Sequence, residues 1–378
     1  MAEAFPLIEV SGPPRERGRQ YGRQASSRIH KGIGHYGAQL RKLNLDHAGV
    51  AALVQAYLPR IRDFDETYIE EMRGIAEGSD ASFEEIVLLN ARTEILKLAE
   101  KPELRAQLVP VDDGCTALCV MPGAAADGQL IHAQNWDWKA ECAETAVVLH
   151  IRREDGPDIL TFTEAGGLAR SGMNSAGIAI TANYLQSDRD YRTVGVPLAL
   201  IRRKVLQQQH LAAAMKAVYA TPKSASNNMT VSQADGICIN FECAPDETFP
   251  VHPENGFLVH ANHFVSPVAL GKLRDMGVGA FGDTLYRDLR VRDLMLPHGG
   301  RATVDHVKAA LADDFQSPFS VCRPIRRNTD DNLSATVATV VMQPARGLME
   351  VAPLPAQGMC FTRYELGMDT QAMRTAAE

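Results

Sequence analysis

The sequence lacks an excess of basic residues, a long apolar run and an N-terminal stretch with the form of a signal peptide. Its 378 residues include 39 Lys and Arg against 46 Asp and Glu, a formal net charge of −7. This charge argues against nucleic acid as the main partner, because phosphate binding needs a concentrated positive field. No apolar run reaches the roughly 18 residues of a membrane span, and the opening MAEAFPLIEV lacks the form of a signal peptide. We therefore expect a cytoplasmic protein that binds neither nucleic acid nor a membrane.

Cysteine is also sparse, and its pattern excludes a class of folds. The seven cysteines are odd in number and scattered, and no two form a C-x-x-C pair. This pattern is typical of free thiols in a reducing compartment and predicts neither a disulfide framework nor a structural zinc site. A hydrophobic content of 45% with 22% charged residues indicates a soluble globular protein with a substantial core.

The densest basic stretch, RERGRQYGR, has the sequence of a helix start. It is short and includes Glu16 among its basic residues, which are Arg15, Arg17, Arg19 and Arg23. We expect a solvated helix face here and not a binding patch for an acidic partner.

The first 110 residues carry the pattern of helices. Residues 12–110 are predicted to be helical, and one amphipathic stripe has apolar residues at three- and four-residue steps and closes at Gly78. The stripe consists of Leu58, Ile61, Phe64, Tyr68, Met72 and Ile75. Ser82 and Glu85 have the spacing of a capping box at the start of a further helix.

After Asp112-Asp113-Gly114 the pattern changes to short β runs. Predicted strands cover Cys115–Met121, Gln129–Trp138, Ala146–Arg152, Ile159–Glu164 and parts of 172–185, 227–245, 256–264, SATVATVVMQP and LMEVAPLP. Helical patterns return at 196–209, 211–220 and 284–315. This succession predicts an α+β or layered α/β fold. The sheet should be largely antiparallel, because tight turns join the first strands.

Three motifs resemble cofactor or cation sites but lack the context that such sites need. GVGAFG (277–282) matches G-x-G-x-x-G, yet the polar GKLRDM precedes it where a nucleotide site needs a strand. His260 and His263 in HANH have no evident third ligand nearby. NTDDN (328–332) lacks the spacing of a calcium loop. The sequence therefore predicts neither a cofactor nor a metal.

Gly114 and Cys115 stand between the acidic turn and the first predicted strand, in VPVDDGCTALCVM. A cysteine in an apolar strand is usually a core residue, and we take Cys119 as one. Cys115 differs because the glycine before it has no Cβ and allows the sulfur to approach the preceding carbonyl. Attack on that carbonyl, an N-to-S acyl shift and hydrolysis would leave Cys115 as a new N-terminus.

Such a cleavage would have a specific chemical consequence. An α-amino group has a pKa near 7.7–8.0, whereas a backbone amide is no base. The new N-terminus would therefore carry a nucleophile with its own proton acceptor. On this interpretation the turn and Gly114-Cys115 form an activation site.

Two further residues complete a candidate site. Asp137 in QNWDW lies one hairpin away, where it could orient the new ammonium group; its alternative role is to cap a turn. Trp136 and Trp138, the two tryptophans of the chain, flank it and are candidates to line a substrate pocket. Asn262 in VHANHF is the candidate donor to a tetrahedral oxyanion, a contact that contributes about 10²–10³ in rate; its alternative role is to cap a loop.

DGCTALC followed by AQNWDW resembles the peptidase C45 family of N-terminal-nucleophile hydrolases, the group of the penicillin acyltransferases and β-alanyl-amine hydrolases. Nearly the whole chain takes part in the resemblance. The other similar stretches, in the family's order, are GPPRERGRQYG, EMRGIAEGSDASFEEIVLLNARTE, TEAG, NSAGIAI, GVPLAL, NFECAP, VHANHF and SPFSVCR.

The resemblance implies a four-layer αββα sandwich and autocatalytic cleavage between Gly114 and Cys115. The products would be a helical α-chain, residues 1–114, and a β-chain, residues 115–378, which stay associated. The family's nucleophile falls on Cys115, the partner of its amino group on Asp137 and its oxyanion asparagine on Asn262. Glu242 in NFECAP matches a recurring acid and joins the two tryptophans as a candidate substrate-binding residue.

One departure concerns an arginine. In the penicillin acyltransferases an arginine stands two residues before the Ala-Thr pair that matches Ala335-Thr336. This chain has Leu333 at that position. Arg323, Arg326 and Arg327 lie nearby, and whether one of them replaces it is left open. The C-terminal RTAAE also lacks a peroxisomal signal of the S-K-L type.

Three functions are compatible with these features. The first is a self-processing amidohydrolase that cleaves a small N-acyl amide through an acyl-enzyme on Cys115. The second is an N-acyltransferase that passes an acyl group from acyl-CoA to a small amine, and the third is a non-catalytic binding protein of the same fold. The missing arginine and the lack of a glycine-rich phosphate cradle favour hydrolysis over transfer.

Overall fold

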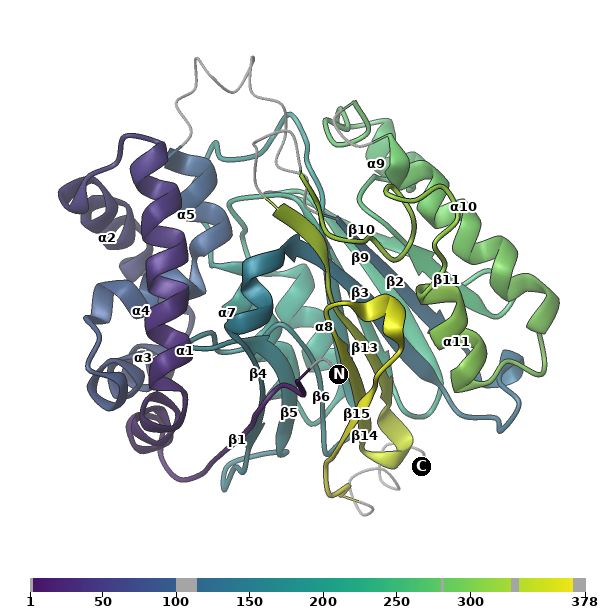
Figure 1. Cartoon of the computed structure of the whole chain (residues 1–378), viewed down its shortest axis with the longest axis horizontal. Helices are drawn as coiled ribbons and strands as arrows, with labels where there is room; N and C mark the ends of the chain where they lie inside the picture. Colours follow the sequence, from purple (N-terminus) through teal and green to yellow (C-terminus); the bar gives the residue numbers. More distant parts are fainter. Residues whose placement is uncertain (1–2, 100–113, 280–281, 328–332, 370–378) are drawn as a thin grey trace.

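Two β-sheets form the centre of the computed structural model, which describes residues 3–99, 114–279, 282–327 and 333–369 (Figure 1). Within these residues, an eight-stranded sheet contains, in spatial order, β1 (Leu7–Val10), β4 (Ala146–Ile151), β5 (Ile159–Glu164), β6 (Ser171–Asn174), β7 (Ile178–Tyr184), β8 (Asn227–Gln233), β9 (Ile237–Cys243) and β10 (Thr248–Val251). A seven-stranded sheet contains β11 (Phe257–His260), β2 (Gly114–Val120), β3 (Ile131–Lys139), β13 (Leu333–Gln343), β14 (Leu348–Pro353) and β15 (Thr362–Glu365), with β12 (Arg326–Arg327) beside β13. The prediction of largely antiparallel sheets is confirmed, since β1 and β4 form the one parallel strand pair among the described residues.

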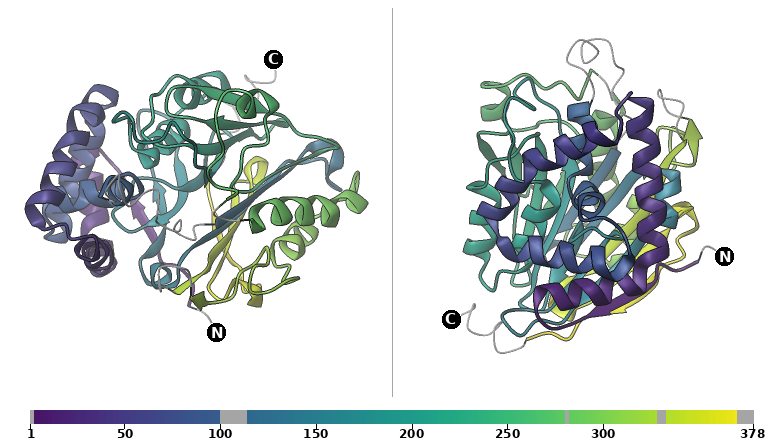
Figure 2. Two further views of the ribbon diagram at one scale, coloured as in Figure 1. Left: turned by 90° about the horizontal axis from the view of Figure 1, so that it is seen from above. Right: turned by 90° about the vertical axis from the view of Figure 1, so that its left-hand side faces the viewer.

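Helices cover the outer faces of both sheets, as Figure 2 shows from two further directions. The eight-stranded sheet is covered by α7 (Leu198–Leu206), α8 (Leu211–Tyr219) and the N-terminal helices, and the seven-stranded sheet by α10 (Asp283–Met295) and α11 (Val304–Leu311). The short α9 (Pro267–Leu270) precedes α10. The predicted four-layer αββα sandwich with a helical N-terminal segment is confirmed.

Side chains from the two inner faces hold the sheets together. The rings of Trp136 in β3 and Phe162 in β5 pack edge to face with their centroids 5.6 Å apart. His132 in β3 reaches Ser232 and Thr181 of the opposite sheet with its two ring nitrogens, each at 2.8 Å. Burial lowers the pKa of His132 to about 3, so its ring is neutral and can donate through one nitrogen and accept through the other.

The N-terminal helices are α1 (Pro14–Lys42), α2 (His47–Phe64), α3 (Glu66–Ser79), α4 (Phe83–Asn90) and α5 (Arg92–Ala99). The predicted capping box of Ser82 and Glu85 is confirmed at the start of α4. The predicted stripe is not one helix, because Asp65 has an extended backbone and accepts a hydrogen bond from the Thr67 amide as an N-cap. Gly78 lies inside α3 and does not close it; the left-handed Asp80, with φ of 61°, follows its last residue.

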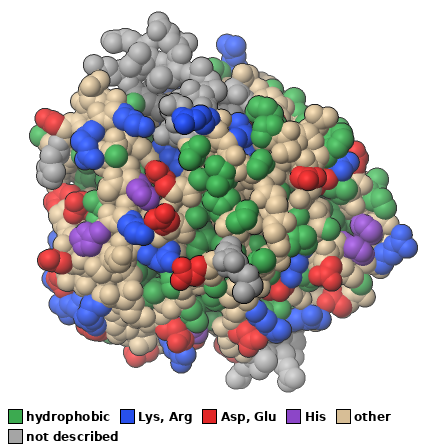
Figure 3. All heavy atoms as spheres, in the orientation of Figure 1, with side chains coloured by type: hydrophobic (Ala, Val, Ile, Leu, Met, Phe, Trp, Pro, Cys, Tyr) green, Lys and Arg blue, Asp and Glu red, His purple; other side chains and the backbone are tan. Residues whose placement is uncertain are grey.

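The prediction of a solvated basic face on α1 is wrong for Arg17. Its side chain is buried and donates to Glu71 of α3 at 2.7 Å, and Glu71 also accepts from the buried Arg203 of α7 at 3.0 Å. The other three arginines of the stretch pair with glutamates near the surface. A charged residue is buried in this way only when a partner compensates for the lost hydration. On the face shown in Figure 3, acidic and basic side chains are interspersed.

The N-terminal segment is part of the sandwich. Its strand β1 pairs with β4, and its helices share one continuous hydrophobic core with the eight-stranded sheet. Tyr21 of α1 donates to the carbonyl of Gly167, and Asn90 of α4 donates to that of Gly166, both in the β5–β6 turn. The division of the chain at residue 114 stays a prediction. No helix of the described residues is both long and apolar enough to traverse a bilayer.

Candidate active site

The β2–β3 hairpin brings together residues that the sequence separates by more than twenty positions. Gly114 lies opposite Asp137 and Cys115 lies opposite Trp136, which confirms the prediction that the turn returns Asp137 to the start of the first strand. A Cβ at position 114 would lie 2.7 Å from Asp137 Oδ2, so only glycine fits here without moving the carboxylate. Asp112 and Asp113 of the predicted acidic turn lie outside the described residues.

The side chain of Cys115 faces the space between the two sheets. It is buried, and its directly opposite neighbour Trp136 shares its face of the hairpin. The guanidinium of Arg170, just before β6, stacks 4.1 Å from the centre of the Trp136 ring and places Nη2 4.0 Å from Cys115 Sγ. The cation of Arg170 is therefore a direct neighbour of the sulfur.

The side chains of Asn262 and Arg287 bind the backbone of Cys115 in β2, beyond the point where the neighbouring strand β11 ends. The amide of Cys115 donates to Asn262 Oδ1 at 2.8 Å, and Arg287 Nη2 donates to the same oxygen at 2.9 Å. Arg287 Nη1 also donates to the Cys115 carbonyl at 2.7 Å. Asn262 Nδ2 donates to the Tyr184 carbonyl at 2.9 Å. Asn262 is therefore brought to Cys115, while its role as an oxyanion donor stays a prediction.

Asp137 lies on the other side of the hairpin from the thiol. Its Oδ1 accepts from Thr336 of β13 at 2.6 Å, and its Oδ2 is 3.4 Å from Arg323 Nε. Arg323 also pairs with Asp283 at the start of α10. Burial alone would raise the pKa of Asp283, but the charges of Arg287 and Arg323 outweigh it, and this pKa is lowered.

Leu333, where the family resemblance would place an arginine, is half exposed at the start of β13, and whether a nearby arginine replaces it stays a prediction. Arg323 reaches Asp137 because the segment that precedes β13 runs beside Thr336. The Thr336 amide donates to the Arg323 carbonyl at 3.0 Å. Arg326 instead lies over the Phe319 ring, and Arg327 is exposed. Arg323 therefore supplies a cation beside Asp137.

The predicted substrate-binding residues Trp138 and Glu242 lie near these residues, but their hydrogen bonds join them to groups other than the Cys115 thiol. Trp138 is buried and donates from Nε1 to the Tyr36 hydroxyl at 3.1 Å. Glu242 is fully buried, where it accepts from His260 at 2.8 Å and from the backbone amides of Val265 and Ser266. These bonds fix the loop that carries Asn262. Glu242 therefore holds this loop in position, and among the described residues it has no hydrogen bond to Cys115 itself.

The Glu242–His260 pair gives a testable pH dependence. Burial opposes the charged imidazole, but the hydrogen bond and charge of Glu242 outweigh it and raise the pKa of His260. The resulting stability is fully present below the unfolded-state pKa of about 6.5 and is lost as pH rises through the folded-state pKa. Glu242→Gln should therefore lower the free energy of unfolding most below about pH 6.5, and less at alkaline pH.

Urea unfolding at several pH values would measure this difference, with Glu254→Gln as the control because Glu254 is exposed. An equal loss for Glu242→Gln at all pH values would mean that His260 does not take up a proton in the folded protein.

The motifs that resembled ligand sites are occupied by other contacts. His263 Nδ1 lies 3.0 Å from the Thr284 hydroxyl, and His260 bonds to Glu242 as described. Gly277 and Val278 donate to Asp275 in a turn. Residues 280 and 281 of GVGAFG and the whole of NTDDN lie outside the described residues. Within the described ranges, no three His, Cys, Asp or Glu side chains gather in a way that could hold a metal ion.

Sequence reasoning missed Arg170, Arg287 and Thr336. Arg170 follows the TEAG motif and Arg287 lies on a helix far from Cys115 in the chain. The available signal was the position of Arg170 between the apolar GGLA and a strand, since an arginine in such surroundings needs a specific partner.

Comparison with known proteins finds similar sequences and similar solved structures. The chain is 27% identical over 322 residues, 84% of each chain, to the acyl-coenzyme A:6-aminopenicillanic-acid-acyltransferase 40 kDa form of Emericella nidulans. Among solved structures it resembles a conjugated bile acid hydrolase from Clostridium perfringens, with 13% identity, a TM-score of 0.44 and coverage of 67% of this chain and 98% of the other. It also resembles the penicillin V acylase from Agrobacterium tumefaciens, with 18% identity, a TM-score of 0.43 and coverage of 64% and 83%.

The family model of the acyl-coenzyme A:6-aminopenicillanic acid acyl-transferases matches residues 124–352, which is more than half of the chain. The protein therefore belongs to the acyl-coenzyme A:6-aminopenicillanic acid acyl-transferase family.

Proposed function

We propose that the protein is a self-processing amidohydrolase that cleaves a small N-acyl amide with Cys115 as its N-terminal nucleophile. The observation that carries the proposal is the setting of Cys115 at the start of β2. Its sulfur faces Arg170 between the sheets, and its amide nitrogen is hydrogen-bonded to Asn262.

Processing would begin with attack of Cys115 Sγ on the Gly114 carbonyl carbon. The C–S bond forms as the C–N bond of the peptide breaks, and the Cys115 nitrogen takes up a proton. Water then hydrolyses the thioester, which gives the Gly114 carboxylate and restores the thiol. Asp137, which lies opposite Gly114, is the residue that we propose to stabilise the ammonium form of the new N-terminus.

The same sulfur would then act on the substrate. The free α-amino group accepts the thiol proton as Sγ attacks the amide carbonyl carbon, and the proton passes to the leaving amine. Asn262, with Arg287 bonded to it, is the proposed stabiliser of the oxyanion. Water then hydrolyses the acyl-enzyme and releases the carboxylic acid.

Acyl transfer is the second candidate, and the name of the Emericella nidulans relative favours it. The acyl-enzyme would be the same, but acyl-CoA would donate the acyl group and a small amine would accept it in place of water. Consumption of acyl-CoA that requires an added amine would identify the transferase. Consumption of amides in water alone would identify the hydrolase.

The test of the proposal is to examine the purified protein for a cut and for a reactive sulfur. N-terminal sequencing should find a second chain that starts at Cys115, and an electrophilic amide analogue should label that residue, as identified by mass spectrometry. An intact, unlabelled chain that still hydrolyses amides would overturn it. An intact, unlabelled and inactive chain would favour the non-catalytic binding protein.

The proposal includes two properties of the processed protein. The α-chain and the β-chain should stay associated, because α1 to α5 and β1 share a core with the eight-stranded sheet. A cytoplasmic location is also proposed, since all seven cysteines, each within the described ranges, are free thiols.

A further inference from the structure

Side chains hold the backbone of Cys115 at a position where a regular sheet would use a strand. In the β2–β11 ladder Ala117 is paired with His260, so the register continued by two residues places Asn262 opposite Cys115. β11 ends before that position, and the Asn262 backbone amide donates to the Thr284 hydroxyl at 2.7 Å. That amide therefore takes no part in the ladder.

Two side chains take the place of the missing strand pair. Asn262 Oδ1 accepts from the Cys115 amide at 2.8 Å, and Arg287 Nη1 donates to the Cys115 carbonyl at 2.7 Å. Arg287 Nη1 also donates to the Thr116 hydroxyl at 2.8 Å, and its Nη2 donates to Asn262 Oδ1 at 2.9 Å. A strand would supply two neutral groups here. The arrangement instead places a fully buried guanidinium at the start of β2, and so adds a positive charge that hydrogen bonding alone does not need.

None of these contacts depends on the peptide bond before Cys115. Cleavage after Gly114 would convert the Cys115 amide into an amine, which can donate to Asn262 Oδ1 whether or not it is charged. The Cys115 carbonyl and the Thr116 hydroxyl follow the scissile bond and would still bind Arg287. The cation would lie within about 6 Å of the new amine, because both bond to one oxygen, and a charge at that range shifts a pKa.

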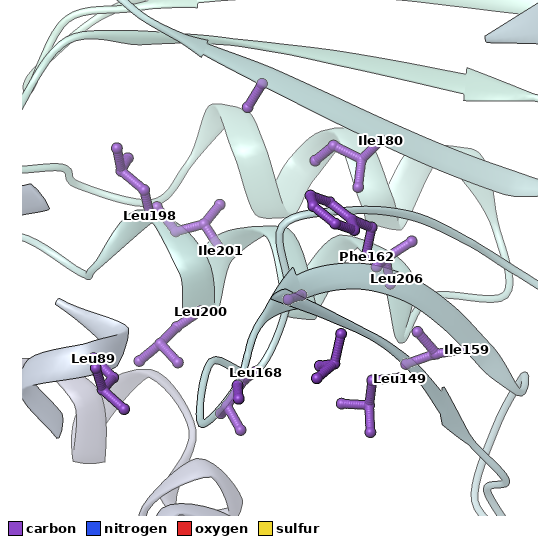
Figure 4. Packing of buried hydrophobic residues seen from close by; sticks show 14 of the residues in the cluster. Leu89, Leu149, Ile159, Phe162, Leu168, Ile180, Leu198, Leu200, Ile201 and Leu206 are labelled. Atoms are coloured by element: carbon purple, nitrogen blue, oxygen red, sulfur yellow. The ribbon is translucent and has the colours of Figure 1, made fainter. Parts of the chain in front are cut away.

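The surroundings of Cys115 contain little water. Cys115 is 1% exposed and belongs to the same hydrophobic cluster as Phe162, Ile180 and Leu206. Figure 4 shows these three side chains among the packed apolar residues of the cluster. Charges interact more strongly in such surroundings than in water. Buried charged groups near Cys115 can therefore set the charge state of its amine.

Charged groups from four parts of the described chain lie around this position. They are Arg170 before β6, Arg287 and Asp283 on α10, Asp137 on β3 and Arg323 before β13. Asp283 Oδ2 is 3.3 Å from Arg287 Nε, and Asp283 also pairs with Arg323. Asp283 therefore compensates part of the charge of Arg287, and removal of either member of this pair should change the local charge in opposite directions.

We infer that Arg287 is a positioning residue that keeps the α-amino group of processed Cys115 in place and in its uncharged, basic form. This inference rests on the proposed function. A free N-terminal amine has a pKa of about 7.7–8.0 and is mostly protonated at neutral pH. A nearby cation disfavours the ammonium form, and the uncharged form is the one that can accept the thiol proton. Asp137, which we propose to stabilise the ammonium form, acts on the same amine in the opposite direction.

Charge variants test the inference through the pH dependence of kcat/KM for a chromogenic N-acyl anilide. The acidic limb of this profile reports the protonation of the base in the free enzyme. Arg287→Gln should move the limb upward by about one pH unit, because a cation is lost. Asp283→Asn should move it downward, because the compensating anion is lost.

Two further variants separate charge from contact. Arg287→Lys keeps the charge, so its acidic limb should stay near that of the wild type, while kcat falls about 10-fold with the lost hydrogen bonds. Arg290→Gln is the matched control, because Arg290 lies on the same helix but pairs with Asp313. It should leave both the limb and kcat unchanged.

Nuclear magnetic resonance tests the inference without catalysis. In protein made with isotope-labelled cysteine, the nitrogen signal of the Cys115 amine should titrate with a pKa that Arg287→Gln raises and Asp283→Asn lowers. Circular dichroism would show that each variant is folded. If Arg287→Gln stays uncut and so has no amine, Asp283→Asn decides, and an unchanged amine pKa in that variant would overturn the inference.

The outcomes separate this inference from the proposed function. A wild-type chain without an amine at Cys115 would contradict the proposed function, and the inference with it. A cut and active protein whose amine titrates alike in the wild type, Arg287→Gln and Asp283→Asn would overturn the role of Arg287 alone. Shifts of the two variants in the same direction would also overturn it, because they would report a change in structure and not in charge.

Discussion

Cys115→Ala should remain a single uncut chain and lose amidase activity by at least about 10³-fold in kcat/KM. Alanine has no atom that can attack the Gly114 carbonyl, so the N-to-S acyl shift cannot begin. Without the shift there is no free α-amino group, and nucleophile and base are lost together. Gel electrophoresis, N-terminal sequencing and the hydrolysis of chromogenic N-acyl anilides would measure both losses.

Cys119→Ala is the matched control for this variant. Cys119 lies on the same face of the same strand and is equally buried, but it packs against Leu130, Cys238 and Leu258. Burial raises the pKa of its thiol, which keeps it protonated and unreactive. The control should be cut and active, with a loss of roughly 1 kcal/mol in stability from the smaller core side chain. Cleavage of Cys115→Ala, or equal effects of the two substitutions, would contradict the assignment of Cys115.

The part of the site that could be predicted from the sequence is the part set by local structure. The β2–β3 hairpin has a short connection, so alternation along two strands suffices to place Asp137 opposite Gly114. Asn262 was reached by its chemistry and by family resemblance, and not by any local pattern.

The arginines around the site could not be predicted in the same way. Arg170 depends on how the two sheets stack, and Arg287 on how α10 crosses the seven-stranded sheet. Arg323 lies beside Asp137 because the segment before β13 runs beside Thr336. No periodic pattern in the sequence predicts that contact. Contacts between distant segments are fixed by packing, whereas sequence patterns report local geometry.

The same distinction applies to the helices. The apolar stripe in residues 58–75 predicted helix correctly, but the break at Asp65 depends on the preference of its side chain for the Thr67 amide over continuation of the helix. The burial of Arg17 depends on Glu71, which lies 54 residues further along the chain. The burial of Arg17 therefore follows from the crossing of α1 and α3, whereas the break at Asp65 is local.

Gly22→Ala should destabilise the protein by about 3 kcal/mol or more, because α1 and α3 cross there with their backbones in contact. A Cβ on Gly22 would lie 2.8 Å from the Ser79 amide nitrogen and still closer to the Ile75 carbonyl oxygen, and neither backbone atom can move without displacing α3. Gly34, in the same helix, is exposed and has no atom within 4 Å of its added Cβ, so Gly34→Ala should stabilise by roughly 0.5–1 kcal/mol. Thermal unfolding followed by circular dichroism should therefore shift in opposite directions for the same chemical change. Similar shifts for both variants would mean that the helices can separate at the crossing, and the buried Arg17–Glu71 pair would then lose the packing that excludes water from it.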